Sequence, residues 1–325
     1  MLVAGTTVFR FGCPGSRLAP RQGFHGLRPG RLAAWDAERL VTALLPTTAP
    51  LHAAAPPSLD PVRTLLPHRR LVLRFTLNDA LGRYKGSLLG IAWSFLNPLL
   101  MLAVFTLAFG TLFANATFAR EGLPPRPPVL SIFCGMVVFA VFGEVLSRAP
   151  SAVLAHPNYV KKVVFPLEIL PVSLVGSALL HAFIGLTILA AGTLALGNAL
   201  SWTALLLPLV LLPLVLLALG VGWFLASLGV YVRDVAHTIG VVSQALFFLT
   251  PIVYPFSLFE SRPLLASILR WNPLKIAIDE ARLVVLWGEL PDFAALGVVT
   301  ATGLVLAWLG FAWFQKTRRG FADVI

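Results

Sequence analysis

Few residues of this 325-residue chain have the types and spacing that chemistry requires. Residues 82–87 (GRYKGS) come nearest to a phosphate-binding loop, but they lack its Gly-Lys-Ser/Thr ending and the strand that precedes it. Cys13 and Cys134 are too few and too far apart for a disulfide framework or a zinc site. The histidines show neither metal-ligand spacing nor a nearby cysteine: His25, His52, His68, His156, His181 and His237. We therefore expect no catalytic, cofactor-binding or metal-binding residues in this chain.

Two ionisable residues stand inside apolar segments, where such a residue is by default a candidate for function. Glu144 has Arg148 four positions later, so an ion pair between successive turns of a helix explains it as well as a function does. His181 has the same two interpretations, a functional group or a buried, hydrogen-bonded histidine.

A short basic loop, residues 156–166 (HPNYVKKVVFP), joins two of the apolar segments. Lys161 and Lys162 are followed at once by an apolar stretch. The loop either satisfies the preference for basic residues on the inner side of a membrane or forms a short helix that docks on a cytoplasmic partner. Periodicity alone does not separate these two hypotheses.

The elements that carry these residues are too apolar for a water-soluble protein. Hydrophobic residues make up 58% of the chain and charged residues 12%, and the mean hydropathy is +0.85. Soluble domains carry about 25% charged residues. The net charge of +11 is explained by basic membrane loops, so we expect no nucleic-acid partner.

The hydrophobic pattern predicts an all-α integral membrane protein with six transmembrane helices, each long enough for a hydrocarbon core of about 30 Å. They fall at about 91–113, 130–150, 170–196, 203–230, 237–255 and 294–314. The fifth is the shortest. Residues 256–292 alternate apolar clusters with single charges, which indicates either two short helices that dip into the outer leaflet or a small folded cap.

A helix rich in arginine is predicted just before the first of these segments, over residues 68–85. Leu73, Leu77, Ala80, Leu81 and Tyr84 share one face of it. This pattern is typical of a helix lying in the membrane interface, the alternative being an ordinary flank of the first span.

Basic residues near the ends of the six segments predict the orientation. With the amino terminus inside, the inner loops carry 13 basic residues and the outer loops six. The 13 are Arg63, Arg69, Arg70, Arg74, Arg83, Lys85, Arg148, Lys161, Lys162, Arg233, Lys316, Arg318 and Arg319. Both termini are thus expected on the cytoplasmic side.

Residues 1–62 differ from the remainder, which we take as one membrane domain, 63–325. They contain arginine but no lysine, with Pro, Gly and Ala scattered throughout, and no arrangement typical of a secretory signal. We interpret them as a disordered extension or as sequence upstream of the true start.

Five strings occur in an order that resembles the membrane subunit of type-two ATP-binding cassette exporters, particularly permeases for O-antigen, capsule or teichoic-acid polysaccharides. They are residues 81–98 (LGRYKGSLLGIAWSFLNP), 156–171 (HPNYVKKVVFPLEILP), 231–234 (YVRD), 248–255 (FLTPIVYP) and 271–276 (WNPLKI). The resemblance covers about residues 68–325 and leaves residues 1–62 without a counterpart.

The resemblance implies a homodimer in the bacterial inner membrane, paired with two copies of a separate ATPase that binds ATP and Mg²⁺. The family's interface helix corresponds to about 69–84, with Arg69, Arg70, Arg74, Arg83 and Tyr84. Its coupling helix, which receives movement from the ATPase, corresponds to about 158–163, with Asn158, Tyr159, Lys161 and Lys162. Its re-entrant outer helices, between the fifth and sixth spans, correspond to about 256–287.

In such a subunit a lipid-linked or nascent polysaccharide crosses the membrane through a channel along the dimer axis. A sugar chain presents hydroxyls and apolar C–H faces, so aromatic walls suit its passage. Candidates for the channel lining, each of which is otherwise a lipid-facing or packing residue, are Phe105, Phe109, Phe139, Phe142, Phe247, Phe248, Tyr254 and Phe256.

Three other functions remain open at this point. One is an exporter of the same architecture for a drug, lipid or other small hydrophobic substrate. Another is an intramembrane sugar transferase, which requires several acids or histidines at one depth, where only Glu144 and His181 are available. The third is a secondary transporter, which is expected to show paired half-repeats that this chain lacks on inspection.

Overall fold

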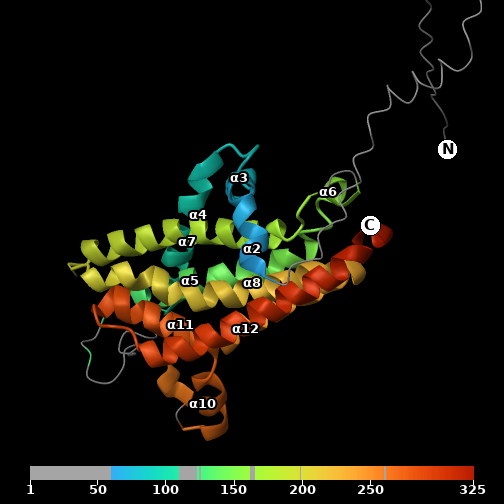
Figure 1. The fold of residues 1–325 in the computed structure, drawn as a ribbon. Helices are drawn as coiled ribbons and strands as arrows, with labels where there is room; N and C mark the ends of the chain where they lie inside the picture. Colours follow the sequence, from blue (N-terminus) through green and yellow to red (C-terminus); the bar gives the residue numbers. More distant parts are fainter. Residues whose placement is uncertain (1–59, 110–122, 124–125, 162–164, 198, 260) are drawn as a thin grey trace, which may run out of the picture. The chain divides into compact units, whose positions relative to one another are not determined.

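The computed structural model describes residues 60–109, 123, 126–161, 165–197, 199–259 and 261–325, and within these ranges the regular structure is helical throughout. Among the described residues, four helical segments are long and apolar enough to cross a membrane: Pro128–Ser151, Ile169–Ala195, Trp202–Tyr231 and Phe293–Val324. Their main helices are α5 (Pro128–Arg148), α7 (Ile169–Ala195), α8 (Leu207–Tyr231) and α12 (Phe293–Thr317). They lie along one another as a bundle (Figure 1).

The core of the bundle is built around α5, whose side chains are buried along most of its length. On α12 the buried residues form a narrower stripe, and apolar residues such as Val305 and Trp308 are exposed. An exposed apolar face on a helix of this length is typical of contact with lipid. The four-helix unit is therefore held by its own core and also presents an apolar outer surface.

Helices α8 and α12 approach each other closely because glycines face one another. A Cβ added to Gly220 would lie 2.5 Å from the backbone of Leu306, and one added to Gly310 would clash with the carbonyl oxygen of Gly220. Small residues that admit the neighbouring backbone are the usual means of packing helices in a membrane.

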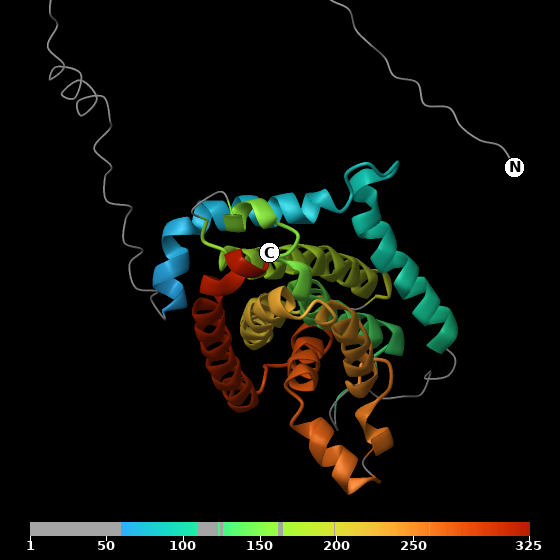
Figure 2. The same cartoon turned by 90° about the vertical axis from the view of Figure 1, so that its right-hand side faces the viewer.

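The amino-terminal part of the described chain crosses the bundle. It consists of α2 (Pro61–Leu65), η1 (Leu66–His68) and α3 (Arg69–Gly82), and α3 packs across α7 (Figures 1 and 2). Thr76 of α3 fits against Gly176, where a Cβ would lie 2.6 Å from the threonine hydroxyl. The helix predicted over 68–85 is thus present.

After α3 the chain passes through η2 (Gly90–Ala92) into α4 (Trp93–Phe109), which contacts α5 and α7. Like α3, α4 runs across the direction of the bundle (Figures 1 and 2).

Between α5 and α7 lie η3 (Ala149–Ser151) and the short helix α6 (Pro157–Lys161), and η4 (Trp202–Leu206) leads into α8. The chain ends in η7 (Arg318–Gly320) and α13 (Phe321–Val324), which contacts α6. Phe321 is fully buried against Phe314 and Tyr231. Within the basic loop predicted between two spans, residues Pro157–Lys161 therefore form a short helix that packs on the chain's last turn.

The stretch between α8 and α12 consists of short helices. These are α9 (Val235–Leu249), η5 (Phe256–Phe259), α10 (Pro263–Arg270), α11 (Pro273–Arg282) and the π-helical turn η6 (Leu283–Trp287). Asn272 caps α11 and Asp292 caps α12, each through a side-chain oxygen that accepts backbone N–H groups. Gly288 ends η6 with a positive φ of 76°, a conformation that favours glycine.

The buried Arg282 fixes this stretch to the bundle. Its guanidinium donates to the carbonyl oxygens of Ser131, Pro251 and Ile252, at distances of 2.8–3.3 Å. Backbone oxygens left free after α9 ends at Leu249 thus receive hydrogen bonds from a charged donor.

The prediction of an all-α protein is confirmed, and four of its six spans match candidate spans. The other two correspond to the shorter apolar helices Trp93–Ala108 and Val235–Leu249, and the first predicted span, 91–113, ends outside the described residues. Residues 256–287 contain the short helices α10 and α11, and their entry into the outer leaflet stays a prediction. Residues 1–59 lie outside the described part, so the interpretation of the extension stays a prediction.

Candidate functional site

Five ionisable residues from three helices meet where α3 crosses the bundle, and we call them the interface cluster: Asp79, Arg83, Glu144, Arg148 and His181. Glu144 of α5 pairs with Arg83 and, at 3.2 Å, with Arg148. Nδ1 of His181, on α7, lies 3.5 Å from the second oxygen of Glu144. The sequence predicted the pair on α5, and the structure adds a partner from α3.

Asp79 and Arg148 form the other half of the interface cluster. The two guanidinium nitrogens of Arg148 lie 2.7 and 2.5 Å from the two carboxylate oxygens of Asp79, a bidentate ion pair. Burial by itself raises the pKa of Asp79. The hydrogen bonds and charge of Arg148, with smaller contributions from Ser177 and Arg83, outweigh it, and the pKa is below its ordinary value. Two cations and two anions thus neutralise one another and hold α3 on α5.

The helix α6 is fastened to α3 by aromatic rings. The ring of Tyr159 stacks on Phe165 at 4.7 Å and on His156 at 5.5 Å, and its edge meets Phe75 of α3 at 5.6 Å. A five-residue helix is too short to be stable alone, so these contacts and those with α13 hold it in place.

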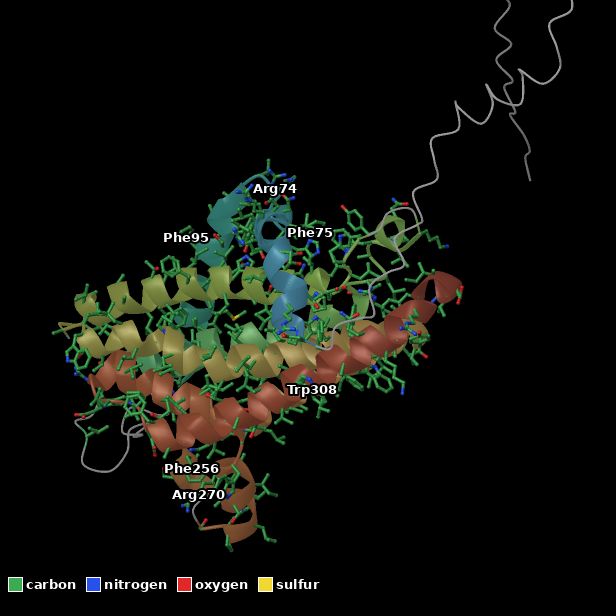
Figure 3. The ribbon with its side chains drawn as sticks, viewed as in Figure 1. Arg74, Phe75, Phe95, Phe256, Arg270 and Trp308 are labelled. Atoms are coloured by element: carbon green, nitrogen blue, oxygen red, sulfur yellow. The ribbon has the colours of Figure 1, made fainter. Side chains whose placement is uncertain are left out.

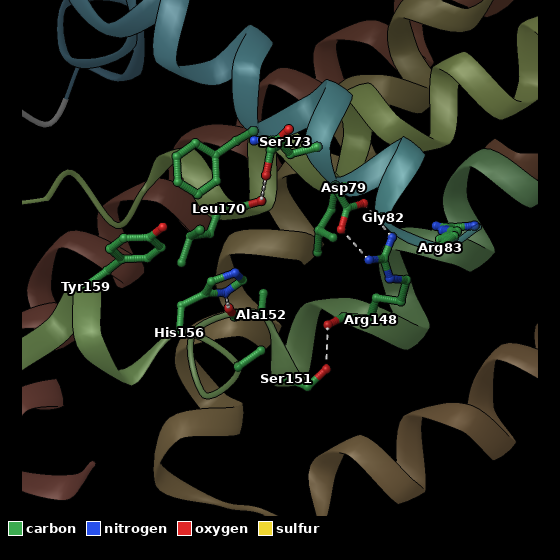
Figure 4. Close-up of a pocket in the computed structure, with 14 residues that line it drawn as sticks. Asp79, Gly82, Arg83, Arg148, Ser151, Ala152, His156, Tyr159, Leu170 and Ser173 are labelled. Carbon is green, nitrogen blue, oxygen red and sulfur yellow. Dashed lines mark hydrogen bonds and ion pairs between the residues drawn. The ribbon is translucent and has the colours of Figure 1, made fainter. Parts of the chain in front are cut away.

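A cavity of about 580 Å³ lies between the aromatic rings and the interface cluster, and we call it the α3–α7 cavity. Figure 4 shows Tyr159 and His156 on one side of it and Asp79, Arg83 and Arg148 on the other. Its volume is within the range of about 300–1,000 Å³ that ligand sites occupy. The remaining lining residues are Phe75, Asn78, Gly82, Ser151, Ala152, Ala155, Leu170, Ser173 and Leu174.

A second buried ion pair joins the start of α7 to the end of the chain. Glu168 is 2% exposed and accepts from Arg318 at 2.9 Å, while its backbone oxygen accepts from the Trp223 indole at 3.1 Å. The segment after α6 is therefore tied to α8 and to the turn that precedes α13.

The residues predicted for the interface helix divide into two groups. Arg69, Arg70 and Arg74 are exposed, and Arg74 extends from the side of α3 that faces away from the bundle (Figure 3). Arg83 and Tyr84 face the bundle, where the Tyr84 ring meets His181 edge-on at 5.9 Å. Of the predicted apolar stripe, Ala80 and Tyr84 pack on the bundle, whereas Leu73, Leu77 and Leu81 are exposed.

Of the predicted coupling residues, Asn158 and Lys161 are exposed on α6 and Tyr159 packs inward. Lys162 lies outside the described residues. The structure therefore places the exposed and the packed members of this set on opposite sides of one short helix.

The candidates for the channel lining are not gathered on one surface of the single chain. Phe139 and Phe142 are buried, Phe139 against the ring of Phe247 at 5.3 Å, whereas Phe248 is 60% exposed. The Tyr254 hydroxyl donates to the carbonyl oxygen of Phe248, and the Lys275 ammonium lies 4.4 Å from the Phe256 ring centre. Phe105 packs partly buried against the core, and the side chain of Phe109 lies outside the described part.

Sequence reasoning missed the pairs Asp79–Arg148 and Glu168–Arg318, whose partners are 69 and 150 residues apart. No local spacing connects such residues. Asp79 lies within the predicted interface helix and Glu168 just before the span predicted at 170–196, and neither position indicates the partner.

The bundle of apolar helices, crossed by a basic helix that is fastened to a short exposed helix, is typical of an integral membrane domain. The model of the ABC-2 type transporter family matches residues 72–286, and the chain belongs to this family.

Relatives of the chain are similar over nearly their whole length. An "O-antigen export system permease protein RfbA" of Myxococcus xanthus is 28% identical over 264 residues, 81% of this chain and 98% of the relative. A protein of the same name from Klebsiella pneumoniae is 25% identical over 256 residues, 78% of this chain and 95% of the relative.

Proposed function

We propose that this chain is the membrane subunit of an ATP-driven exporter that moves a lipid-linked or nascent polysaccharide of the O-antigen type out of the cell. The observation that carries the proposal is the similarity to the Myxococcus xanthus permease, which extends over 98% of that protein. The chain is then a transport subunit and not an enzyme.

The proposed assembly contains two copies of this chain and two of a separate ATPase, which supplies the ATP and Mg²⁺ chemistry. Support comes from membership of the ABC-2 family and from the lack of a phosphate-binding loop in the sequence. Asn158 and Lys161 on the outer side of α6 are the proposed contacts with the ATPase.

The proposed membrane arrangement has six segments, with α4 and α9 completing the four long spans and α10 and α11 re-entering from the outer side. It lies in the bacterial inner membrane with both termini in the cytoplasm. The excess of basic residues in the loops on one side supports this orientation. The aromatic candidates for the channel lining remain part of this proposal.

Movement would pass from α6 to the rest of the subunit through the contacts described above. A push on α6 displaces Tyr159, whose ring meets Phe75 of α3. Since α3 is joined to α5 by the Asp79–Arg148 and Arg83–Glu144 pairs, the same displacement reaches the spans. ATP-driven closure of the partner ATPases would thereby make the two membrane subunits open a channel along their shared axis.

The test is a surface-glycan profile of cells that lack this gene, together with an assay for lipid-linked polymer retained inside. We expect long glycan to disappear from the surface and polymer to accumulate in the cell, and the plasmid-borne gene to restore both. An unchanged profile would refute the polysaccharide substrate and favour a small hydrophobic one.

A further inference from the structure

We propose that the α3–α7 cavity binds a short saccharide segment of the exported polymer. The proposal rests on the export function above and adds a binding site to it. The cavity borders the apolar core of the bundle and is bounded by α3, η3, α6 and α7.

The first argument is the mixture of donors and acceptors in its walls. Asn78 offers both an amide N–H and an oxygen, and the Ser151 and Ser173 hydroxyls, whose hydrogens go to backbone oxygens, are left as acceptors. Tyr159 also lines the cavity, and its hydroxyl can both donate and accept. A sugar hydroxyl both donates and accepts, so such walls suit a polyol.

The second argument is charge. The cavity contains two guanidinium groups, but Arg148 is held by Asp79 in a bidentate pair and Arg83 is held by Glu144. A phosphate site requires cations that are not already neutralised, and it would not include the carboxylate of Asp79. The paired charges leave polarised N–H groups and no net positive charge, which favours a neutral ligand over an anion.

The third argument is the apolar part of the lining. Phe75, Ala152 and Leu174 supply carbon surface beside the polar groups. The C–H faces of a sugar ring need such surface, while its hydroxyls need the opposite wall. Tyr159 and His156 connect the cavity to α6, the helix that we propose contacts the ATPase. A saccharide bound in the cavity would therefore change the position of α6.

The experiment uses the complete exporter with its ATPase, purified in detergent, with Cys13→Ser and Cys134→Ala as background. Ser151→Cys places a thiol in the cavity, and Ala236→Cys, an exposed position outside it, is the matched control. A polar maleimide is added with either the cells' own O-polysaccharide, freed from lipid by mild acid, or inorganic pyrophosphate. We expect the polysaccharide to slow labelling of Ser151→Cys at least threefold, to leave Ala236→Cys unchanged, and pyrophosphate to protect neither.

Two further variants test the contacts in the Ser151→Cys background. Asn78→Ala and Tyr159→Phe are each expected to raise the polysaccharide concentration for half-protection about threefold to tenfold, the effect of one lost hydrogen bond. Leu77→Ala, next to Asn78 but exposed outside the cavity, is expected to have no effect.

Absence of protection by polysaccharide, or equal protection by pyrophosphate, would overturn the proposal. If either result were obtained while gene-deleted cells had lost their surface glycan, the saccharide site would be refuted and the export function would still be supported. An unchanged glycan profile would instead remove the export function itself.

Discussion

The close approach of α8 and α12 gives a stability prediction that depends on a single methyl group. In Gly220→Ala the added Cβ would lie 2.5 Å from the carbonyl carbon and oxygen of Leu306 and 2.7 Å from the nitrogen of Ala307. Ordinary contacts of this kind begin near 3.4 Å. The two backbones must therefore separate by about 1 Å, and no flexible side chain is present to absorb the change.

Overpacking of this kind costs about 3 kcal/mol at the upper end of its usual range. Replacing glycine by alanine within a helix recovers about 1 kcal/mol. We expect a net loss of about 2 kcal/mol, which corresponds to a fall in melting temperature of about 4–8 °C for a domain of this size.

The assay is thermal unfolding of the purified protein in detergent. Gly297→Ala is the matched control, because Gly297 lies on α12 and an added Cβ would meet nothing within 4 Å. We expect this control to melt at or slightly above the temperature of the original protein. If Gly220→Ala had the same melting temperature as Gly297→Ala, the close backbone contact between α8 and α12 would be refuted.

Three further predictions concern the interface cluster and α6. Glu144→Gln leaves Arg83 without its anion. Because the side chains involved are 14–33% exposed, we expect the free energy of unfolding to fall by about 2 kcal/mol, between the values for surface and buried pairs. Thermal unfolding measures this loss, and the exposed control Glu289→Gln is expected to show none. The lowered pKa of Asp79 means that its stabilisation is complete above its ordinary value of 3.8 and is lost as the pH falls through the lower folded value. The melting-temperature difference between the original protein and Asp79→Asn should therefore be constant from pH 7 to about 5 and shrink below 4; a difference that grows on acidification would contradict this sign. Reversing the charges of Lys161 and Lys162 to Glu is expected to abolish surface glycan with membrane insertion unchanged, and undiminished glycan would remove the proposed ATPase contact.

The sequence located the long helices well because their ends carry local signals. The predicted span 170–196 is α7, Ile169–Ala195, and the predicted 130–150 overlaps α5, Pro128–Arg148, which begins at a proline and ends at an arginine. The Glu144–Arg148 pair was likewise predictable, since its partners are one helical turn apart.

The rest of the candidate site depends on contacts between distant segments. Arg148 makes its bidentate pair with Asp79, 69 positions earlier, and nothing in either neighbourhood indicates the other. The sequence predicted the apolar stripe of α3, but Leu73, Leu77 and Leu81 of this stripe are exposed. The face of α3 that packs on α7 is instead determined by Thr76, which fits against Gly176. Such matching of shapes arises only when the helices are brought together.

The paired glycines of α8 and α12 restrict how this subunit can change shape. Gly310 meets the backbone of Gly220, and Gly303 faces the carbonyl oxygen of Pro213, so the two helices interlock at several levels. Sliding one helix past the other would drive backbone atoms together, and these two spans must therefore travel as one rigid body. Helix α9, which has no buried residue of its own in the single chain, is free of this restraint. For the proposed dimeric exporter, we therefore expect the passage for the polymer to open along α9 and between the subunits, with the α8–α12 pair as the fixed wall.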